Sequence, residues 1–266
     1  MKLVTYEAGG QVRTGVLTDA GVLDSGFATM RELLGAGPPA QPRGEPVQPE
    51  RLLPPVTDPE KIVCIGLNYL SHAQEQGAEP PNTPTLFAKY RNALAAPDSQ
   101  VKLPSYSSKV DYEAEIAFAI GTRAKDVAEA DALDHVAGYM LLNDLSARDM
   151  QFATPQWMPG KIFDGAAPCG PWLVTPDEAG AHDAIGIRLT LNGEEMQSGS
   201  TADLVHSIPA LVVYLSKLMT LEPGDVISTG TPAGVGSLRS PRVWLKPGDE
   251  IVVESPTLGR LATTLA

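Results

Sequence analysis

Residues 111–120 carry the pattern of polar and apolar positions that is most informative in this sequence. Successive side chains of a strand point to opposite faces, so Glu113 and Glu115 lie on one face. Residues 116–120 are alanine or large apolar residues on both faces, which predicts a strand buried on both sides. Burying two neighbouring carboxylates costs several kcal/mol or more, and a divalent cation commonly offsets that cost. The pattern therefore favours half of a metal site, and a half-exposed strand with solvated glutamates stays the alternative.

Short apolar runs separated by turn residues predict many strands and few helices elsewhere in the chain. We expect a small β meander in residues 1–35 and further strands near residues 62–65, 84–89, 134–142, 189–194, 242–245 and 251–253, and just before the glycine-rich residues 230–236. Helical spacing predicts helices over residues 29–34, 145–151 and 208–219.

Proline and glycine are concentrated in residues 37–49, and this composition predicts a linker. We therefore expect a β-rich α+β protein in two parts. A small N-terminal β domain plus linker would occupy residues 1–50, and a larger domain would occupy residues 51–266.

The composition indicates a globular protein and excludes several functional classes. Of the 266 residues, 43% are hydrophobic and 20% are charged, which is ordinary for a globular chain. The net charge of −12 repels phosphate backbones and anionic lipids, so we expect neither a nucleic acid nor a membrane as partner. Local cations in one pocket can still bind an anionic substrate. Cys64 and Cys169 are too few for a disulfide framework, and neither a signal peptide nor a membrane-spanning run is visible, so we predict a cytoplasmic protein.

A histidine and a glutamate stand three positions apart in residues 71–75. On a helical turn such residues face the same side, so Glu75 can orient the imidazole of His72 and make it a better base. An incidental surface pair is the alternative. The turn-rich residues 76–81 that follow would suit a lid that carries this pair over a site.

A second group of polar residues follows the predicted strand 134–142. Asp144, Arg148 and Gln151 are spaced by four and three, which places them along one face of the predicted helix. Asp144 has a simpler alternative role as the N-cap of that helix. With Glu113 and Glu115 it would otherwise complete a set of hard oxygen ligands, which suits Mg²⁺, Mn²⁺ or Ca²⁺ rather than zinc or copper.

Two further candidates come later in the chain. Lys161 follows a loop and stands in an apolar neighbourhood, so both a surface and a functional role are open. Thr231 belongs to the glycine-rich residues 230–236, whose amides and hydroxyls suit a carboxylate. This loop is not a nucleotide-binding phosphate loop, because neither a following Lys-Ser/Thr nor a GxGxxG is present. The sequence also has no serine-hydrolase elbow and no pair of histidines spaced for an iron-oxygenase site.

Taken in order, these motifs resemble the fumarylacetoacetate hydrolase family. The resemblance runs from about residue 60 to 255, over the segments 65–69 with His72 and Glu75, 111–115, 143–151, Lys161 and 229–236. It implies a rolled mixed β-sheet, a homodimer and the compact bacterial branch of the family, which includes acylpyruvases and hydroxyheptadienedioate isomerases. It also implies site roles: Mg²⁺ or Mn²⁺ on Glu113, Glu115 and Asp144; substrate polarisation by Lys161, Arg148 and Gln151; water activation by His72 and Glu75; and a substrate-carboxylate contact by Thr231.

The reaction that follows from this resemblance is carbon–carbon bond hydrolysis of a 2,4-dioxo acid, such as an acylpyruvate. A small 2-oxo acid would bind the cation, and the pair of His72 and Glu75 would deliver water. Decarboxylation of an oxaloacetate-like acid and isomerisation of a hydroxymuconate-like diacid are alternatives that use the same enolate. A non-catalytic metal-binding interaction protein is an alternative of another class. The loops at residues 74–84 and 105–109 are the expected source of specificity.

Overall fold

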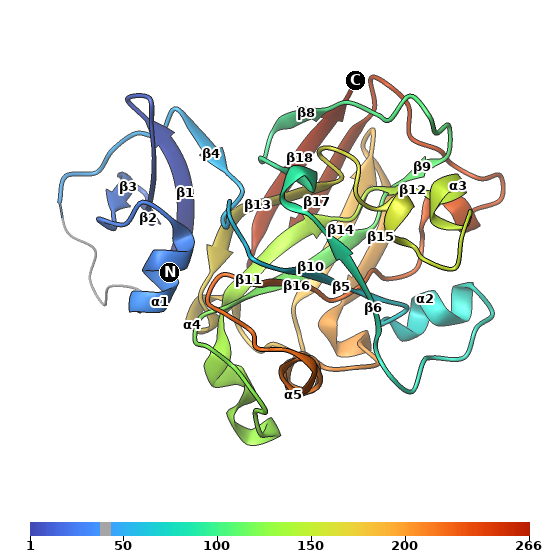
Figure 1. Ribbon diagram of the computed structural model, residues 1–266. Coiled ribbons are helices and arrows are strands. Elements are labelled where there is room, and N and C mark those ends of the chain that lie inside the picture. Colours follow the sequence, from blue (N-terminus) through green and yellow to red (C-terminus); the bar gives the residue numbers. More distant parts are fainter. Residues whose placement is uncertain (38–43) are drawn as a thin grey trace.

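The computed structural model describes residues 1–37 and 44–266. Two large sheets dominate it (Figure 1). In spatial order the main path of the 11-stranded sheet is β3 (Gly21–Asp24), β2 (Gln11–Thr18), β1 (Lys2–Ala8), β13 (Ala167–Val174), β11 (Val136–Asn143), β10 (Ala114–Ile120), β16 (Val226–Ser228), β5 (Ile62–Gly66) and β6 (Thr85–Lys89). β4 (Arg51–Leu53) pairs with β1, and β7 (Leu94–Ala95) pairs with β13.

The second sheet packs its strands β14 and β17 against β10 and β11 of the first. Its order is β15 (Glu194–Ser200), β14 (Gly186–Leu191), β17 (Glu250–Ser255), β18 (Gly259–Leu265) and β8 (Ser99–Val101). A small ladder joins β9 (Val110–Asp111) to β12 (Ser146–Ala147). The helices are α1 (Met30–Ala36), α2 (Leu70–Glu75), α3 (Arg148–Gln151), α4 (Pro176–Ala179) and α5 (Ile208–Leu218). The predicted β-rich fold with a mixed sheet is confirmed, since β5 and β16 run parallel while β10 and β11 run antiparallel.

β10 has the burial that its sequence predicts. Every residue from Ala114 to Ile120 is buried, because β11 and β16 flank the strand in the sheet and the second sheet packs nearby. Water does not reach a strand covered in this way, so a carboxylate beside it cannot be solvated. The glutamates at its start therefore need partners within the protein.

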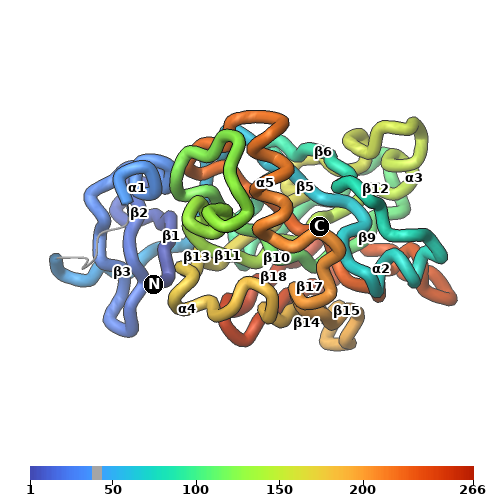
Figure 2. The backbone as a smooth tube through the Cα atoms, turned by 90° about the horizontal axis from the view of Figure 1, so that it is seen from below, coloured from blue at the N-terminus to red at the C-terminus, as the bar shows by residue number. Residues whose placement is uncertain are grey.

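The N-terminal elements lie at one end of the molecule, and α2 and α3 lie at the opposite end (Figure 2). β1 pairs with β13 through Lys2 opposite Val174, so the N-terminal strands extend the large sheet. α1 starts where the sequence predicts, with Thr29 as N-cap in a capping box with Glu32. The predicted linker of residues 37–49 falls partly on residues 38–43, which are outside the described residues. The division at residue 50 stays a prediction.

Two predicted elements are wrong. The helix expected over residues 145–151 begins only at Arg148, because Ser146 and Ala147 pair with β9 instead. Asp144 is therefore neither on this helix nor its N-cap, a position that Ala147 holds. The strand expected over residues 242–245 is absent from the described chain, where Val243 and Leu245 donate single backbone hydrogen bonds to Gly236 and Val110. Among the described residues, no helix is long and apolar enough to cross a membrane.

Candidate active site

Three buried carboxylates meet at the end of the ladder between β10 and β11. Glu113 directly precedes β10 and Asp144 directly follows β11, and the antiparallel register that sets Ala114 opposite Asn143 brings them together. With Glu115, each offers a carboxylate oxygen, and these oxygens all lie within 4.8 Å of one another. The structure thus brings together the three residues that the sequence predicts as metal ligands.

Two buried lysines contact these carboxylates. Nζ of Lys161 lies 2.5 Å from Oε2 of Glu113 and 2.8 Å from Oδ2 of Asp144, and it donates to Oγ of Ser146 at 2.7 Å. Nζ of Lys89 lies 2.7 Å from Oδ1 of Asp144. Although burial opposes its charge, the carboxylates of Asp144 and Glu113 raise the pKa of Lys161. Lys161 is therefore a cation in contact with the site, and the surface role considered for it is wrong because its side chain is 2% exposed.

Arg148 at the start of α3 links two acidic residues. Its Nε donates to Oδ2 of Asp111 at 2.9 Å, its Nη2 to Oε1 of Glu113 at 2.7 Å, and its Nη1 to Oε1 of Gln151 at 2.9 Å. The pairing of β9 with β12 brings Asp111 to this place. Burial raises the pKa of Glu113, but Arg148 and Lys161 outweigh that effect and hold it well below its usual value. Glu113 is therefore ionised.

Glu115 differs from its neighbours because, among the described residues, no cationic side chain lies within ion-pair distance of it. Its Oε2 accepts hydrogen bonds from the hydroxyl of Ser228 and from the amide of Gly230, the latter at 3.1 Å. Burial, and then the charges of Asp144 and Glu113, raise the pKa of Glu115 to about 8.

Among the described residues, Glu115 is the one carboxyl group of this cluster that no cation compensates. Four buried carboxylates, those of Asp111, Glu113, Glu115 and Asp144, contact one another or three buried cations, Lys89, Lys161 and Arg148. A divalent cation bound here would compensate the charge of Glu115 and favour its ionised form, and such hard oxygen donors suit Mg²⁺ or Mn²⁺. The residues present fit a divalent metal.

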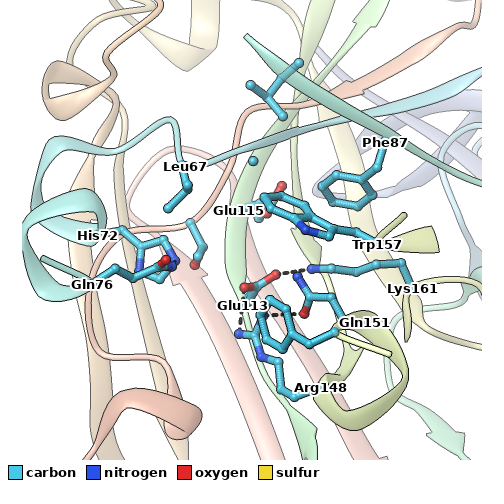
Figure 3. Close-up of a pocket in the computed structure, with 14 residues that line it drawn as sticks. Leu67, His72, Gln76, Phe87, Glu113, Glu115, Arg148, Gln151, Trp157 and Lys161 are labelled. Atoms are coloured by element: carbon cyan, nitrogen blue, oxygen red, sulfur yellow. Dashed lines mark hydrogen bonds and ion pairs between the residues drawn. The ribbon is translucent and has the colours of Figure 1, made fainter. Parts of the chain in front are cut away.

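His72 and Gln76 lie across the cavity from Lys161 and Arg148 (Figure 3). Nδ1 of His72 lies 3.0 Å from Oε2 of Glu75, as the sequence predicts, and the other oxygen of Glu75 accepts from the amide of Gly234 at 2.9 Å. Because the carboxylate accepts, Nδ1 carries the proton. Nε2 is then unprotonated, and it accepts a hydrogen bond from the side-chain amide of Gln76 at 2.8 Å. The incidental surface pair is excluded, since His72 is 5% exposed.

These groups surround one cavity of about 50 Å³. Seven of the residues predicted as site residues line it: His72, Glu113, Glu115, Arg148, Gln151, Lys161 and Thr231. Asp144 and Glu75 stand behind this lining, in contact with Lys161 and His72. The hydroxyl of Thr231 donates to the carbonyl of Ala114 at 2.9 Å and accepts from Gln197 at 2.8 Å. Its role as a contact for a substrate carboxylate stays a prediction.

The sequence gives no functional signal for several residues of this site. Lys89 is visible only as a cation at the end of a strand, and Gln76 only as part of a polar loop. Ser146 and Ser228 contact the carboxylates, yet isolated serines are too common to be singled out. Trp157 and Phe87 form one wall of the cavity, with ring centroids 5.9 Å apart.

Comparison with known proteins decides the family. A family profile described as "Fumarylacetoacetate (FAA) hydrolase C-terminal" matches residues 61–266. The chain belongs to the fumarylacetoacetate hydrolase family. It is 45% identical over 213 residues to the mitochondrial oxaloacetate tautomerase fahd2 of Xenopus laevis. The aligned residues make up 79% of this chain and 67% of that protein.

Solved structures agree with this assignment. Fumarylacetoacetate hydrolase from Exiguobacterium antarcticum has a TM-score of 0.90 at 34% identity, covering 100% of this chain and 99% of that chain. Fumarylpyruvate hydrolase from Pseudomonas aeruginosa, in complex with Mn²⁺ and pyruvate, has a TM-score of 0.72 at 30% identity, covering 82% of this chain and 92% of that chain. The predictions of the fold and of an enzyme of this family are confirmed.

Proposed function

We propose that this enzyme uses a divalent cation to act on a small 2-oxo acid through the enolate form of that acid. The observation that carries the proposal is the buried cluster of Glu113, Glu115 and Asp144. Their carboxylate oxygens lie within 4.8 Å of one another, and Glu115 has no cationic partner among the described residues. Oxygen ligands of this kind suit Mg²⁺ and Mn²⁺ equally. The Mn²⁺ and pyruvate named for the Pseudomonas aeruginosa structure support both the metal and the class of ligand.

The carboxylates of Glu113, Glu115 and Asp144 would hold the cation. When bound, the cation would attract the carboxylate and keto oxygens of the acid and stabilise the negative charge that develops there. Lys161 and Arg148 add positive charge on the same side of the cavity. Burial strengthens their effect, because charges interact more strongly where water is excluded.

Hydrolytic cleavage of a carbon–carbon bond in a 2,4-dioxo acid is the reaction that the geometry supports best. His72 has its proton on Nδ1, toward Glu75, and so presents Nε2 as a base to the cavity. A water molecule that gives its proton to Nε2 would attack the 4-keto carbon, and the bond between C3 and C4 would break. Acetylpyruvate and water would give acetate and pyruvate. Gln76 would have to leave Nε2 before water can bind there.

Keto–enol tautomerisation of oxaloacetate is the second candidate. It is favoured by the 45% identity to the oxaloacetate tautomerase of Xenopus laevis. This reaction needs no water attack: a proton leaves C3, the enolate forms, and a proton is returned to the 2-keto oxygen. His72 would accept the proton from C3 and return it to that oxygen. Decarboxylation and isomerisation of a hydroxymuconate-like diacid use the same enolate. A 5-carboxymethyl-2-hydroxymuconate delta-isomerase from Mycobacterium smegmatis, 32% identical with a TM-score of 0.86, supports the last of these.

Product analysis separates these reactions. Protein loaded with Mg²⁺ or Mn²⁺ is mixed with acetylpyruvate or with oxaloacetate, and NMR follows the reactants, with a chelator as control. Acetate and pyruvate from acetylpyruvate would establish the hydrolase, and faster exchange between the keto and enol forms of oxaloacetate would establish the tautomerase. Carbon dioxide and pyruvate from oxaloacetate would indicate a decarboxylase. Turnover that survives complete removal of the metal would contradict the proposal.

A homodimer and a cytoplasmic location remain proposals. The homodimer is supported by resemblance to the family. The cytoplasmic location is supported by the composition, because two cysteines are too few for a disulfide framework. Light scattering at several protein concentrations tests the assembly.

A further inference from the structure

A second and larger cavity adjoins the candidate active site. Its volume is about 320 Å³, against about 50 Å³ for the cavity at the carboxylates. Gln76, Arg148 and Phe152 line both cavities, so the two spaces adjoin at these side chains. The smaller cavity has room for little more than a 2-oxo acid group, since one water already needs about 10–15 Å³ of such space. The remainder of a longer substrate would extend into the larger cavity.

Two cations without a carboxylate partner line the larger cavity. Lys109 and Arg242 are both exposed, and within residues 1–37 and 44–266 neither has a carboxylate oxygen within 4.0 Å. One acid, Asp149, also lines the cavity, but its Oδ1 already accepts from the hydroxyl of Ser107 at 2.6 Å and from the amide of Met150 at 3.0 Å. On a chain with a net charge of −12, two unpaired cations in one cavity point to an anionic ligand.

The fold holds these two cations in the same cavity although they are far apart in sequence. Lys109 directly precedes β9, and Arg242 directly follows Pro241 in a segment outside the helices and strands. The amide of Leu245 donates to the carbonyl of Val110 at 2.9 Å, which joins the two segments. Phe152 and Trp244 add aromatic walls to the cavity. Apolar walls in this cavity, of which Phe152 also lines the cavity at the carboxylates, suit a carbon chain.

We propose that Lys109 and Arg242 bind the distal carboxylate of the substrate, so that the enzyme prefers 2-oxo acids with a second carboxylate at the far end. This inference rests on the proposed function, because it takes the 2-oxo end to lie at Glu113, Glu115 and Asp144. It assigns Lys109 and Arg242 a role in specificity and none in the chemical step.

Binding calorimetry on the Mn²⁺-loaded protein tests the inference without turnover. The ligands are pairs of equal chain length with and without the terminal carboxylate: 2-oxoglutarate and 2-oxopentanoate, 2-oxoadipate and 2-oxohexanoate, 2-oxopimelate and 2-oxoheptanoate. At the chain length that reaches the cations, the diacid should bind roughly 10- to 100-fold more tightly than the monoacid. Lys109→Gln and Arg242→Gln should each reduce that preference and leave the monoacid affinity unchanged.

Matched controls remove a similar charge elsewhere. Lys102 and Arg91 are exposed and outside both cavities, so Lys102→Gln and Arg91→Gln should keep the full preference for the diacid. Equal affinity for monoacid and diacid at all three lengths, or a preference that survives both cavity substitutions, would refute the inference alone. If no 2-oxo acid binds the Mn²⁺-loaded protein, the proposed function fails, and the distal site fails with it.

Discussion

Nζ of Lys89 lies 2.7 Å from Oδ1 of Asp144, and both side chains are 0% exposed. The same amine donates to the carbonyl of Lys161 and, at 2.9 Å, to the carbonyl of Ala166. It therefore joins the end of β6 to the residue after β11 and to the segment that carries Lys161. Asp144 and Lys161 owe their positions partly to a lysine that is absent from the lining of the cavity.

Replacing Lys89 with methionine should lower the free energy of unfolding by about 3–5 kcal/mol, because it leaves a buried carboxylate with less compensation. Urea denaturation of the metal-free protein measures the loss. Lys125→Met is the control, since the ion pair of Lys125 with Asp126 is largely exposed and is worth about 1 kcal/mol or less. Similar losses in the two variants would show that the buried pair has no special role.

Neutralising Glu115 should weaken metal binding while sparing the metal-free fold. Burial and the neighbouring charges raise the pKa of this carboxyl to about 8, so its charge is unfavourable in the absence of a cation. Glu115→Gln keeps the shape and removes the charge, and we expect Mn²⁺ affinity to fall by roughly 100-fold, about 2.7 kcal/mol. The metal-free variant should unfold at the same urea concentration as the parent or a higher one.

Mn²⁺ titration and urea denaturation with and without metal check this prediction. Saturating metal should stabilise the parent by an amount that grows with the logarithm of its concentration, and should stabilise Glu115→Gln much less. The exposed Glu129 supplies the control variant Glu129→Gln, which should behave as the parent. Unchanged metal affinity in Glu115→Gln would remove Glu115 from the ligand set, and loss of the metal-free fold would contradict the charge argument.

The sequence predicts the clustered carboxylates of this site better than it predicts the residues that support them. The apolar residues around Glu113 and Glu115 mark them as candidates in the sequence. Asp144 is marked by its position directly after a predicted buried strand. Lys89 and Asp111 act through contacts with residues 55 and 37 positions away, namely Asp144 and Arg148. No local pattern marks a side chain whose partner is set by strand register.

The two wrong elements have a similar cause. Residues 145–151 have helical spacing, but Ser146 and Ala147 gain ladder bonds with β9, and only Arg148–Gln151 form a helix. Residues 242–245 have strand-like composition, but their amides form only isolated backbone hydrogen bonds, from Val243 to Gly236 and from Leu245 to Val110. Within the described chain they do not pair with a neighbouring strand. Tertiary pairing overrides propensity in both cases.

His72 and Glu75 give a test of the reaction that does not depend on metal affinity. His72→Gln removes the base, so turnover should fall by about 10²- to 10⁴-fold, whereas Mn²⁺ affinity should stay the same. Glu75→Gln keeps the imidazole but weakens the acceptor that holds the proton on Nδ1, so it should cause a smaller loss. Steady-state kinetics and Mn²⁺ titration on the same preparations measure both quantities. A loss of metal binding in His72→Gln, or a larger loss of turnover in Glu75→Gln, would contradict these roles.

Gly66 at the end of β5 leaves the space that Trp157 fills. A Cβ at residue 66 would lie 2.2 Å from Cζ3 and 2.9 Å from Cη2 of the Trp157 ring, so the ring must move in Gly66→Ala. Overpacking of this kind costs about 1–3 kcal/mol, and the ring is also a wall of the cavity at the carboxylates. We therefore expect Gly66→Ala to lower both the free energy of unfolding and kcat/KM.

A double-mutant cycle tests whether the contact with Trp157 causes this effect. Trp157→Phe removes the outer ring atoms, so Gly66→Ala should cost less stability in that background than in the parent, with a coupling of at least about 0.5 kcal/mol. Gly35→Ala is the control, because the nearest atoms to a Cβ at Gly35 are 4.0 Å away and alanine favours the helix α1. Strict additivity of the two site substitutions would mean that the strain at Gly66 is relieved without moving the Trp157 ring, and the cavity wall would then keep its shape.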